Sequence, residues 1–511
     1  AGRPCRIVVT APRRSAADAV FRHAARRLGL APARGDLRLG AGRELRFVAP
    51  DRLLREPPAA DLVLVDEAAA IPAPLLEALL RRDPRIVYAT TVHGYEGTGR
   101  GFALRFRASL DRLAPGWREV ELEVPVRWAA EDPLEAWLNR SLLLDAAPAS
   151  PAASGNAPRC RRLDRDALLD DEPRLRHLFG LLVQAHYRTT PSDLRQLLDA
   201  PGVGLHVAEV DDVPVGVAVT VAEGRIDAAT SLAVWAGLRR LRGHLVAQSL
   251  AGHAGLEAAP QLAIRRVQRI AVDPGWRRRG VGRALLASLA RESREAGDDL
   301  VATSFGMTPG LLAFWTACGF RPARVGLRRE ASSGAHALMM LHPLSDDGEA
   351  LADEAARRLG GALPILLRDV LADLESELAD PLRACLPPPP TGCTEADWLE
   401  AVAFAFGARG PDACAASLQR VVGTLRLRSA LPGPPQGAAL TARFLDHAPW
   451  ARVASQLGCR GRGQAIRQLR AALRPALRAR HATGLAERIA RLEGLRHDPA
   501  RGSSGDDPSR E

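Results

Sequence analysis

The chain has 511 residues, enough for roughly three domains, and its 47% hydrophobic and 25% charged residues are ordinary for a globular protein. The net charge is +11 and there is no lysine, so all 70 basic residues are arginine, which excludes Schiff-base chemistry. The seven cysteines form no CxxC pair, so neither a zinc site nor a disulfide framework is indicated. We find no bilayer-spanning apolar run and no signal peptide, and we therefore expect a cytoplasmic protein.

Residues 1–145 alternate short apolar runs with helical segments. Strands are expected at 6–10, 44–49, 61–66 and 85–91, and a helix at 16–28. Runs of Val, Ile and Leu separated by helices are typical of a parallel sheet covered on both faces, so we predict an α/β domain. Because the chain opens without Met and runs straight into a strand of the buried type, we interpret its start as truncated.

The rest of the chain divides by composition. Residues 146–159 are Ala, Pro, Ser and Gly without periodicity, which predicts a linker. A second, mixed domain is expected over 160–345, with strands at 204–210, 215–222, 267–272 and 300–306 and a long helix at 282–296. Residues 346–500 are predicted to be helical and Arg-rich, and residues 501–511 to be disordered.

A glycine-rich turn after the strand at 267–272 is the sharpest functional signal. From Arg269 to Arg283 it reads RIAVDPGWRRRGVGR. Gly280 and Gly282 let the backbone approach a ligand closely, and the helix N-terminus behind them presents unpaired N–H groups. The pattern therefore predicts a pyrophosphate site, with charge-assisted contacts from Arg277, Arg278, Arg279 and Arg283. A strand–turn–helix without a ligand would show the same short motif.

This segment resembles the coenzyme A loop of the GNAT acetyltransferase superfamily. Downstream, FWTACGF from Phe314 to Phe320 is similar to an element of that superfamily. The resemblance implies a GNAT α+β fold over 160–345 and acetyl-CoA as cofactor. It also implies that the backbone near Ala271 and Val272 holds the thioester oxygen as it becomes an oxyanion. The implied acetyl-CoA contacts are Ile270, Ala271, Val272, Arg277, Arg278, Arg279, Gly280, Val281, Gly282 and Arg283.

Paired carboxylates end the strand at 61–66. Asp66 and Glu67 fit a Walker B motif, in which Asp66 binds Mg²⁺ and Glu67 polarises the attacking water, although a solvated strand end would read the same. The segments DEAAAIP, from Asp66, and TTVHGYEGTGRGF, from Thr90, resemble the RecA-like helicase module of the bacterial tRNA(Met) cytidine acetyltransferases. The resemblance implies that Arg100 contacts ATP phosphates.

The phosphate-binding loop G-x-x-x-x-G-K-[ST] is missing from the sequence. In the family this loop lies upstream of the segment equivalent to residues 6–10, which fits a truncated start. We therefore expect a partial ATPase module over 1–145 and no appreciable ATP hydrolysis by this chain.

Two segments point to RNA. QAHYRTTPSDL, from Gln184, resembles a family element in which His186 could act as general base and Tyr187 could stack on a base, although it could also be a capped helix end with satisfied side chains. From Arg420 to Arg496 there are 15 Arg against three acidic residues, which favours tRNA phosphates as the partner over an ordinary solvated helix face. Helical spacing predicts one shared face for Arg467, Arg470, Arg474 and Arg478, with the interleaved leucines packing on another.

The resemblance implies an RNA acetyltransferase that transfers acetyl from acetyl-CoA to N4 of the wobble cytidine of elongator tRNA(Met), assisted by ATP and Mg²⁺ in the full-length protein. Two alternatives stay open at this point. One is a GNAT enzyme acting on protein or small-molecule amines, and the other is a non-catalytic RNA-binding protein.

Overall fold

The structure, a computed structural model, describes residues 5–31, 34–40, 42–83, 85–91, 99–126, 128–129, 131–148, 156–185, 190–330, 334–480 and 483–496, without the side chains of 99–105, 483 and 496. The chain forms two compact units, Ala1–Thr220 with Gln268–Leu289 and Arg329–Ala335, and Val221–Val267 with Ala290–Arg328 and His336–Glu511. Within the described residues, no helix combines the length and the apolar character that a membrane crossing needs.

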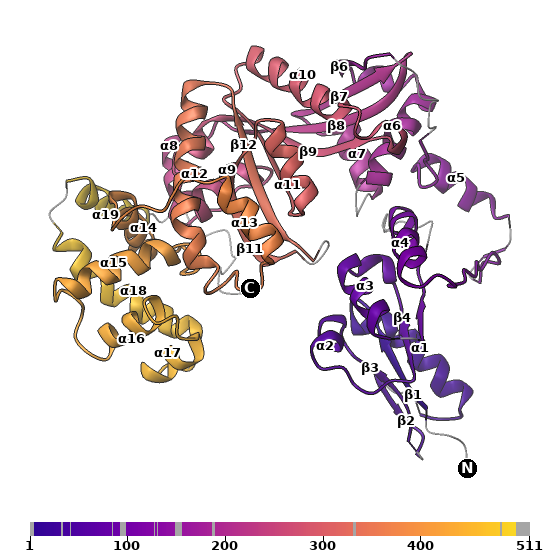
Figure 1. The fold of residues 1–511 in the computed structure, drawn as a ribbon, viewed down its shortest axis with the longest axis horizontal. Helices are drawn as coiled ribbons and strands as arrows, with labels where there is room; N and C mark the ends of the chain where they lie inside the picture. Colours follow the sequence, from indigo (N-terminus) through magenta and orange to yellow (C-terminus); the bar gives the residue numbers. More distant parts are fainter. Residues whose placement is uncertain are drawn as a thin grey trace. The chain divides into compact units, whose positions relative to one another are not determined.

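The N-terminal region is built on a five-stranded sheet (Figure 1). Its strands are β1 (Cys5–Thr10), β2 (Asp36–Arg38), β3 (Arg43–Phe47), β4 (Leu62–Val65) and β5 (Ile86–Tyr88). The strand order is β2-β3-β1-β4-β5, and all neighbours run parallel except β2, which is antiparallel to β3. The helices of this region are α1 (Arg14–Arg27), α2 (Pro50–Arg55), α3 (Ala73–Arg82), α4 (Gly99–Leu113) and α5 (Pro133–Ser141).

Both faces of this sheet are covered. Successive residues of a strand point to opposite faces. Val9 of β1 belongs to one buried cluster with Phe21 of α1, whereas Val8 belongs to another with Leu53 of α2 and Leu76 of α3. This is why the strands read as continuous apolar runs, and it confirms the predicted α/β module.

A seven-stranded mixed sheet follows. Its strands are β6 (Arg159–Leu163), β7 (Val203–Val210), β8 (Val213–Gly224), β9 (Ala263–Val272), β10 (Leu300–Gly306), β11 (Arg321–Arg329) and β12 (His336–Pro343), in the order β11-β12-β10-β9-β8-β7-β6. β10 is parallel to β9 and antiparallel to β12. The sheet and its helices confirm the predicted α+β fold. These helices are α6 (Glu172–Ala185), α7 (Pro191–Asp199), α8 (Ala228–Trp235), α9 (Leu245–Ala254), α10 (Val281–Glu295) and α11 (Pro309–Ala317).

The remainder of the chain is helical, as predicted. Its core contains Phe404, Phe406 and Leu418 together with the buried leucines of the helix at 462–478. The helices are α12 (Asp346–Leu366), α13 (Ser376–Ala384), α14 (Glu395–Phe406), α15 (Ala415–Leu427), α16 (Gln436–Phe444), α17 (Trp450–Gln456), α18 (Arg462–Arg478) and α19 (Thr483–Arg496).

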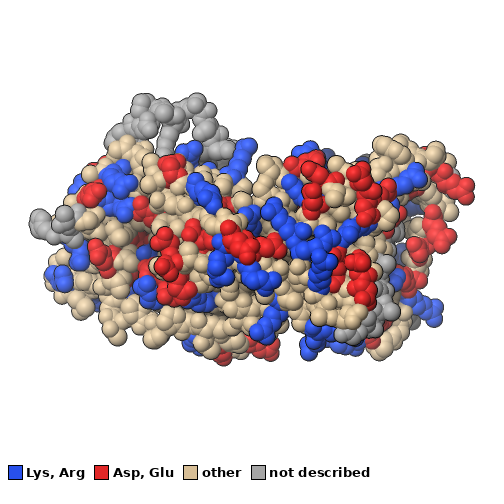
Figure 2. Space-filling model, turned by 90° about the horizontal axis from the view of Figure 1, so that it is seen from above, with Lys and Arg blue, Asp and Glu red and all other residues tan. Residues whose placement is uncertain are grey.

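Figure 2 shows that arginine groups and acidic groups are intermixed on the face it presents. The charge of +11 therefore does not make that whole face uniformly basic.

Candidate functional site

The turn after β9 is anchored by buried side chains. Asp273 is fully buried: its N–H donates to the Val215 carbonyl at 2.9 Å, and its carboxylate accepts from the Gly275 N–H, also at 2.9 Å. Trp276 is buried as well and closes a 3-10 turn over Pro274–Trp276. Because these groups hold the turn, the exposed residues that follow have a fixed starting point.

Residues 277–283 carry the predicted ligand-binding groups. Arg277, Arg278, Arg279 and Arg283 are exposed, whereas Val281 is buried. The Arg279 guanidinium lies 5.2 Å from the centre of the Trp276 ring, a cation–π distance. Gly280 has φ +82°, a left-handed conformation that favours glycine, and a Cβ there would meet nothing within 4 Å. The backbone therefore approaches open space where the helix begins.

This set of donors fits a pyrophosphate. α10 starts at Val281, and the first N–H groups of an α-helix have no partner within the helix. They combine with the positive end of the helix dipole and with four exposed guanidinium groups, which are the donors that bind diphosphates. The predicted cofactor contacts from Arg277 to Arg283 thus lie together around one helix N-terminus.

The end of β9, where the oxyanion site is predicted, extends past its pairing with β10. β10 pairs with β9 from Ile264 to Val267, and β9 continues for five residues past that ladder, to Val272. Ile270, Ala271 and Val272 lie in this extension, immediately before the anchored turn. Backbone N–H groups of this extension that point to the β10 side have no partner in the printed β10 pairing, and thioester polarisation would require such groups.

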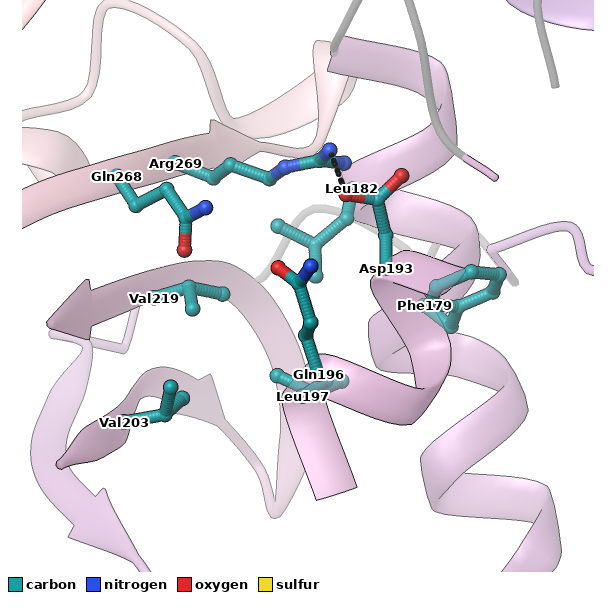
Figure 3. A pocket seen from close by; sticks show the side chains of 9 residues that line it. All are labelled: Phe179, Leu182, Asp193, Gln196, Leu197, Val203, Val219, Gln268 and Arg269. Atoms are coloured by element: carbon teal, nitrogen blue, oxygen red, sulfur yellow. Dashed lines mark hydrogen bonds and ion pairs between the residues drawn. The ribbon is translucent and has the colours of Figure 1, made fainter. Parts of the chain in front are cut away.

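A small cavity lies between β9 and helices α6 and α7 (Figure 3). Its volume of about 20 Å³ suits a water molecule and not a nucleobase. At its edge the Arg269 Nη2 donates to the Asp193 Oδ1 at 2.6 Å. The Asp193 Oδ2 accepts from the Thr190 N–H at 2.6 Å and from the Thr190 hydroxyl at 2.9 Å, so one carboxylate joins the start of α7 to β9.

The predicted acceptor residues His186 and Tyr187 lie outside the described residues. α6 ends at Ala185 and α7 begins at Pro191, so the two residues fall in the connection between these helices. Arg269 and Asp193 pair at the end of this connection, and this pair was not predicted from the sequence. A Thr-x-x-Asp cap before a helix was visible as a signal, but its arginine partner is 76 residues away.

The predicted Walker B residues, Asp66 and Glu67, directly follow β4. The Asp66 N–H donates to the Thr10 carbonyl at 2.8 Å, and the Asp66 Oδ1 accepts from the Glu67 N–H at 3.1 Å. Glu67 has φ 49°, so the chain turns sharply there. Arg100 lies in the first turn of α4, and its side chain is outside the described residues. Among the described residues, no group of three or more side chains that could hold a metal ion occurs.

The arginine face of α18 differs from the open surface that was expected. Leu469, Leu473 and Leu477 are fully buried, which confirms their packing role. Arg470, however, donates to the Arg409 carbonyl at 2.8 Å, and Arg474 donates to the Ala405 carbonyl at 3.0 Å.

These two arginines turn inward because aromatic rings of α14 lie beneath them. The Arg470 guanidinium lies 5.2 Å from the centre of the Phe404 ring, and that of Arg474 lies 5.6 Å from the centre of the Phe406 ring. Arg478 forms an exposed ion pair with Glu493 at 2.5 Å, and Arg467 is exposed. RNA binding by the four arginines stays a prediction, and Arg467 is the one best placed for it.

Three family models match the chain in succession: "RNA cytidine acetyltransferase NAT10/TcmA, helicase domain" over 1–145, "GNAT acetyltransferase 2" over 177–299 and "tRNA-binding domain" over 348–483. The tRNA(Met) cytidine acetyltransferase TmcA of Nitrosococcus halophilus is 45% identical over 479 residues, which are 92% of this chain and 64% of that protein. The chain belongs to the RNA cytidine acetyltransferase family. The TmcA of Yersinia pestis is 40% identical over 83% of this chain and 59% of its own.

The chain thus spans 59% to 64% of the length of these two relatives. Among solved structures, the ribosomal-protein-S18-alanine N-acetyltransferase of Escherichia coli matches 37% of this chain and 94% of its own, at 16% identity and a TM-score of 0.25. The three matched regions coincide with the parallel-sheet module, the strands and helices around the turn after β9, and the helical region.

Proposed function

We propose that this chain transfers the acetyl group of acetyl-CoA to N4 of the wobble cytidine of elongator tRNA(Met), and that ATP hydrolysis assists this reaction in the full-length protein. The observation that supports the proposal most is the turn after β9, where four exposed arginines and a helix N-terminus follow the part of β9 that runs past its pairing with β10, in a chain of this family. The arginine excess of the helical region favours RNA as the acceptor.

The residues of this chain divide the work as follows. Residues 277–283 bind the pyrophosphate, and the backbone of Ala271 and Val272 stabilises negative charge on the thioester oxygen. Acetyl-CoA supplies an activated acyl group. The N4 amine is a poor nucleophile because its lone pair is delocalised into the ring, so catalysis depends on positioning and on proton removal. We assign proton removal to His186 and stacking on the cytosine to Tyr187.

ATP would be bound by the N-terminal module. Asp66 would hold Mg²⁺, Glu67 would orient the attacking water and Arg100 would contact the phosphates. The wobble base has to leave its stack to enter an acetyltransferase site, and ATP-driven remodelling of the bound RNA would lower that cost.

The test is acetyl transfer with isotopically labelled acetyl-CoA, followed by nucleoside mass spectrometry of the recovered tRNA. We expect labelled N4-acetylcytidine from elongator tRNA(Met) and none from the same tRNA with uridine at the wobble position. Parallel reactions contain a protein mixture and spermidine as acceptors. Label in protein or spermidine but not in tRNA would favour an amine acetyltransferase and refute the proposal. Binding of tRNA with no transfer to any acceptor would favour a non-catalytic RNA-binding protein.

A further inference from the structure

A hollow of about 500 Å³ opens in the helical region, within the size range of ligand sites (~300–1,000 Å³). It lies between α18 and the loop that joins α15 to α16. Apolar groups make up most of its lining, with two arginines and no acidic residue. The lining residues are Trp398, Leu425, Arg428, Ala430, Leu431, Pro432, Ala472, Pro475, Ala476, Ala479 and Arg480.

One wall of the hollow is a stacked pair. The Arg480 guanidinium lies 4.1 Å from the centre of the ring of buried Trp398. The Arg480 Nε is buried and makes no hydrogen bond to the described residues, so a donor next to the hollow is left without an acceptor. A planar cation supported by an aromatic ring, beside an apolar floor, is a surface on which nucleobases stack.

The surroundings favour a polyanion. Arg428 lines the hollow and is exposed, and Arg426, two residues earlier in the chain, is also exposed. Between them the Leu427 side chain is 90% exposed, an apolar group at a basic rim. Arg428 and Arg480 line the hollow, Arg426 is exposed beside its rim, and no acidic residue is in the lining, so an acidic backbone would find complementary charge there.

We propose that this hollow binds one unpaired base of an RNA strand, stacked on Arg480, with the adjoining phosphate at Arg428. The proposal rests on the proposed RNA-binding function and specifies it. The lining is apolar and the base is held by stacking, so any nucleobase that is out of a helix fits and a paired base does not. Arg428 contributes affinity that depends on salt, whereas the stacked base contributes affinity that does not.

The test fills the hollow without changing any charge. Ala476→Leu and Ala479→Leu both place a larger side chain in it, and Ala471→Leu, at an exposed position of the same helix outside the hollow, is the matched control. Fluorescence anisotropy measures binding of tRNA, of a single-stranded oligonucleotide and of a duplex of the same sequence, each at several salt concentrations. Circular dichroism confirms that the variants are folded.

We expect either filling variant to weaken binding of tRNA and of the single strand about tenfold, the order of one lost base stack, with the salt slope unchanged. Ala471→Leu should bind like the wild type, and duplex binding should not change in any variant. Equal binding by filled and control variants would overturn the base site, as would an equal loss for duplex and single strand. If the wild type binds no tRNA at all, the proposed function itself is refuted. This outcome is distinguishable from the two results that overturn only the base site, because both of those require measurable binding by the wild type.

Discussion

Asp193→Asn is expected to impair acetyl transfer without impairing cofactor binding. Asp193 joins the start of α7 to β9 through Arg269, at the end of the connection that carries His186 and Tyr187. Asparagine keeps a carbonyl oxygen for the Thr190 N–H but removes the negative charge opposite Arg269. The variant therefore retains the helix cap and loses the attachment to the strand.

The magnitude follows from burial. The side chains of Arg269 and Asp193 are 15% and 23% exposed, so the pair is mostly but not fully withdrawn from water. Removing one partner of a fully buried pair costs about 3–5 kcal/mol, and we expect about 2 kcal/mol here because water can reach the remaining charge. Displacement of the acceptor segment by about an ångström would lower kcat by roughly 100-fold.

The assay separates these effects. We expect Asp193→Asn to lower kcat for acetyl transfer, to leave coenzyme A affinity by calorimetry unchanged and to reduce the free energy of unfolding. Asp397→Asn is a matched control, because Asp397 caps α14 through Thr394 and pairs with Arg420 at 2.6 Å in the same way, outside the region matched by the acetyltransferase model. A wild-type kcat for Asp193→Asn, or an equal loss for Asp397→Asn at temperatures where both are folded, would refute this reasoning.

Three further predictions concern the cofactor turn and the buried groups of the helical region. Gly280→Glu should weaken coenzyme A binding at least tenfold through repulsion of the pyrophosphate, whereas Gly297→Glu, at a similarly open position with φ +74°, should not; equal affinities in calorimetry would count against the turn. Burial alone would raise the pKa of Asp397, but hydrogen bonds led by that from Arg420 hold it below its ordinary 3.8. The stability that Asp397 contributes is present above the pKa of its carboxyl in the unfolded chain and is lost as pH falls below about 4. The free energy of unfolding of Asp397→Asn, measured by chemical denaturation, should therefore decrease less on acidification than that of the wild type. Burial raises the pKa of the Cys414 thiol to about 12, so at pH 9 iodoacetamide should label exposed Cys385 but spare Cys414 until the protein unfolds, as read by mass spectrometry.

Local sequence patterns were sufficient to predict the positions of several strands and helices of this protein and of the glycine turn between β9 and α10. The strand at 267–272 and the helix at 282–296 were predicted close to the observed β9 and α10, because a run of apolar residues and a helical repeat are both written within about fifteen residues. The glycine turn between them was equally local, which is why the predicted coenzyme A loop could be located without a structure. β6 was not predicted, because its sequence, RCRRL, is mostly charged. It is an edge strand, and charged side chains are common on edge strands.

Only the tertiary structure decided which groups meet across long separations. The spacing of Arg470 and Arg474 placed both on one face of a helix, but it could not show that the rings of Phe404 and Phe406 lie beneath that face. Arg269 and Asp193 each belong to a readable local motif, and their pairing depends on how α7 packs beside β9. Periodicity is a property of consecutive residues, so it can be recognised in a short stretch of sequence. These contacts join residues far apart in the chain and depend on how whole elements pack, so no short stretch of sequence predicts them.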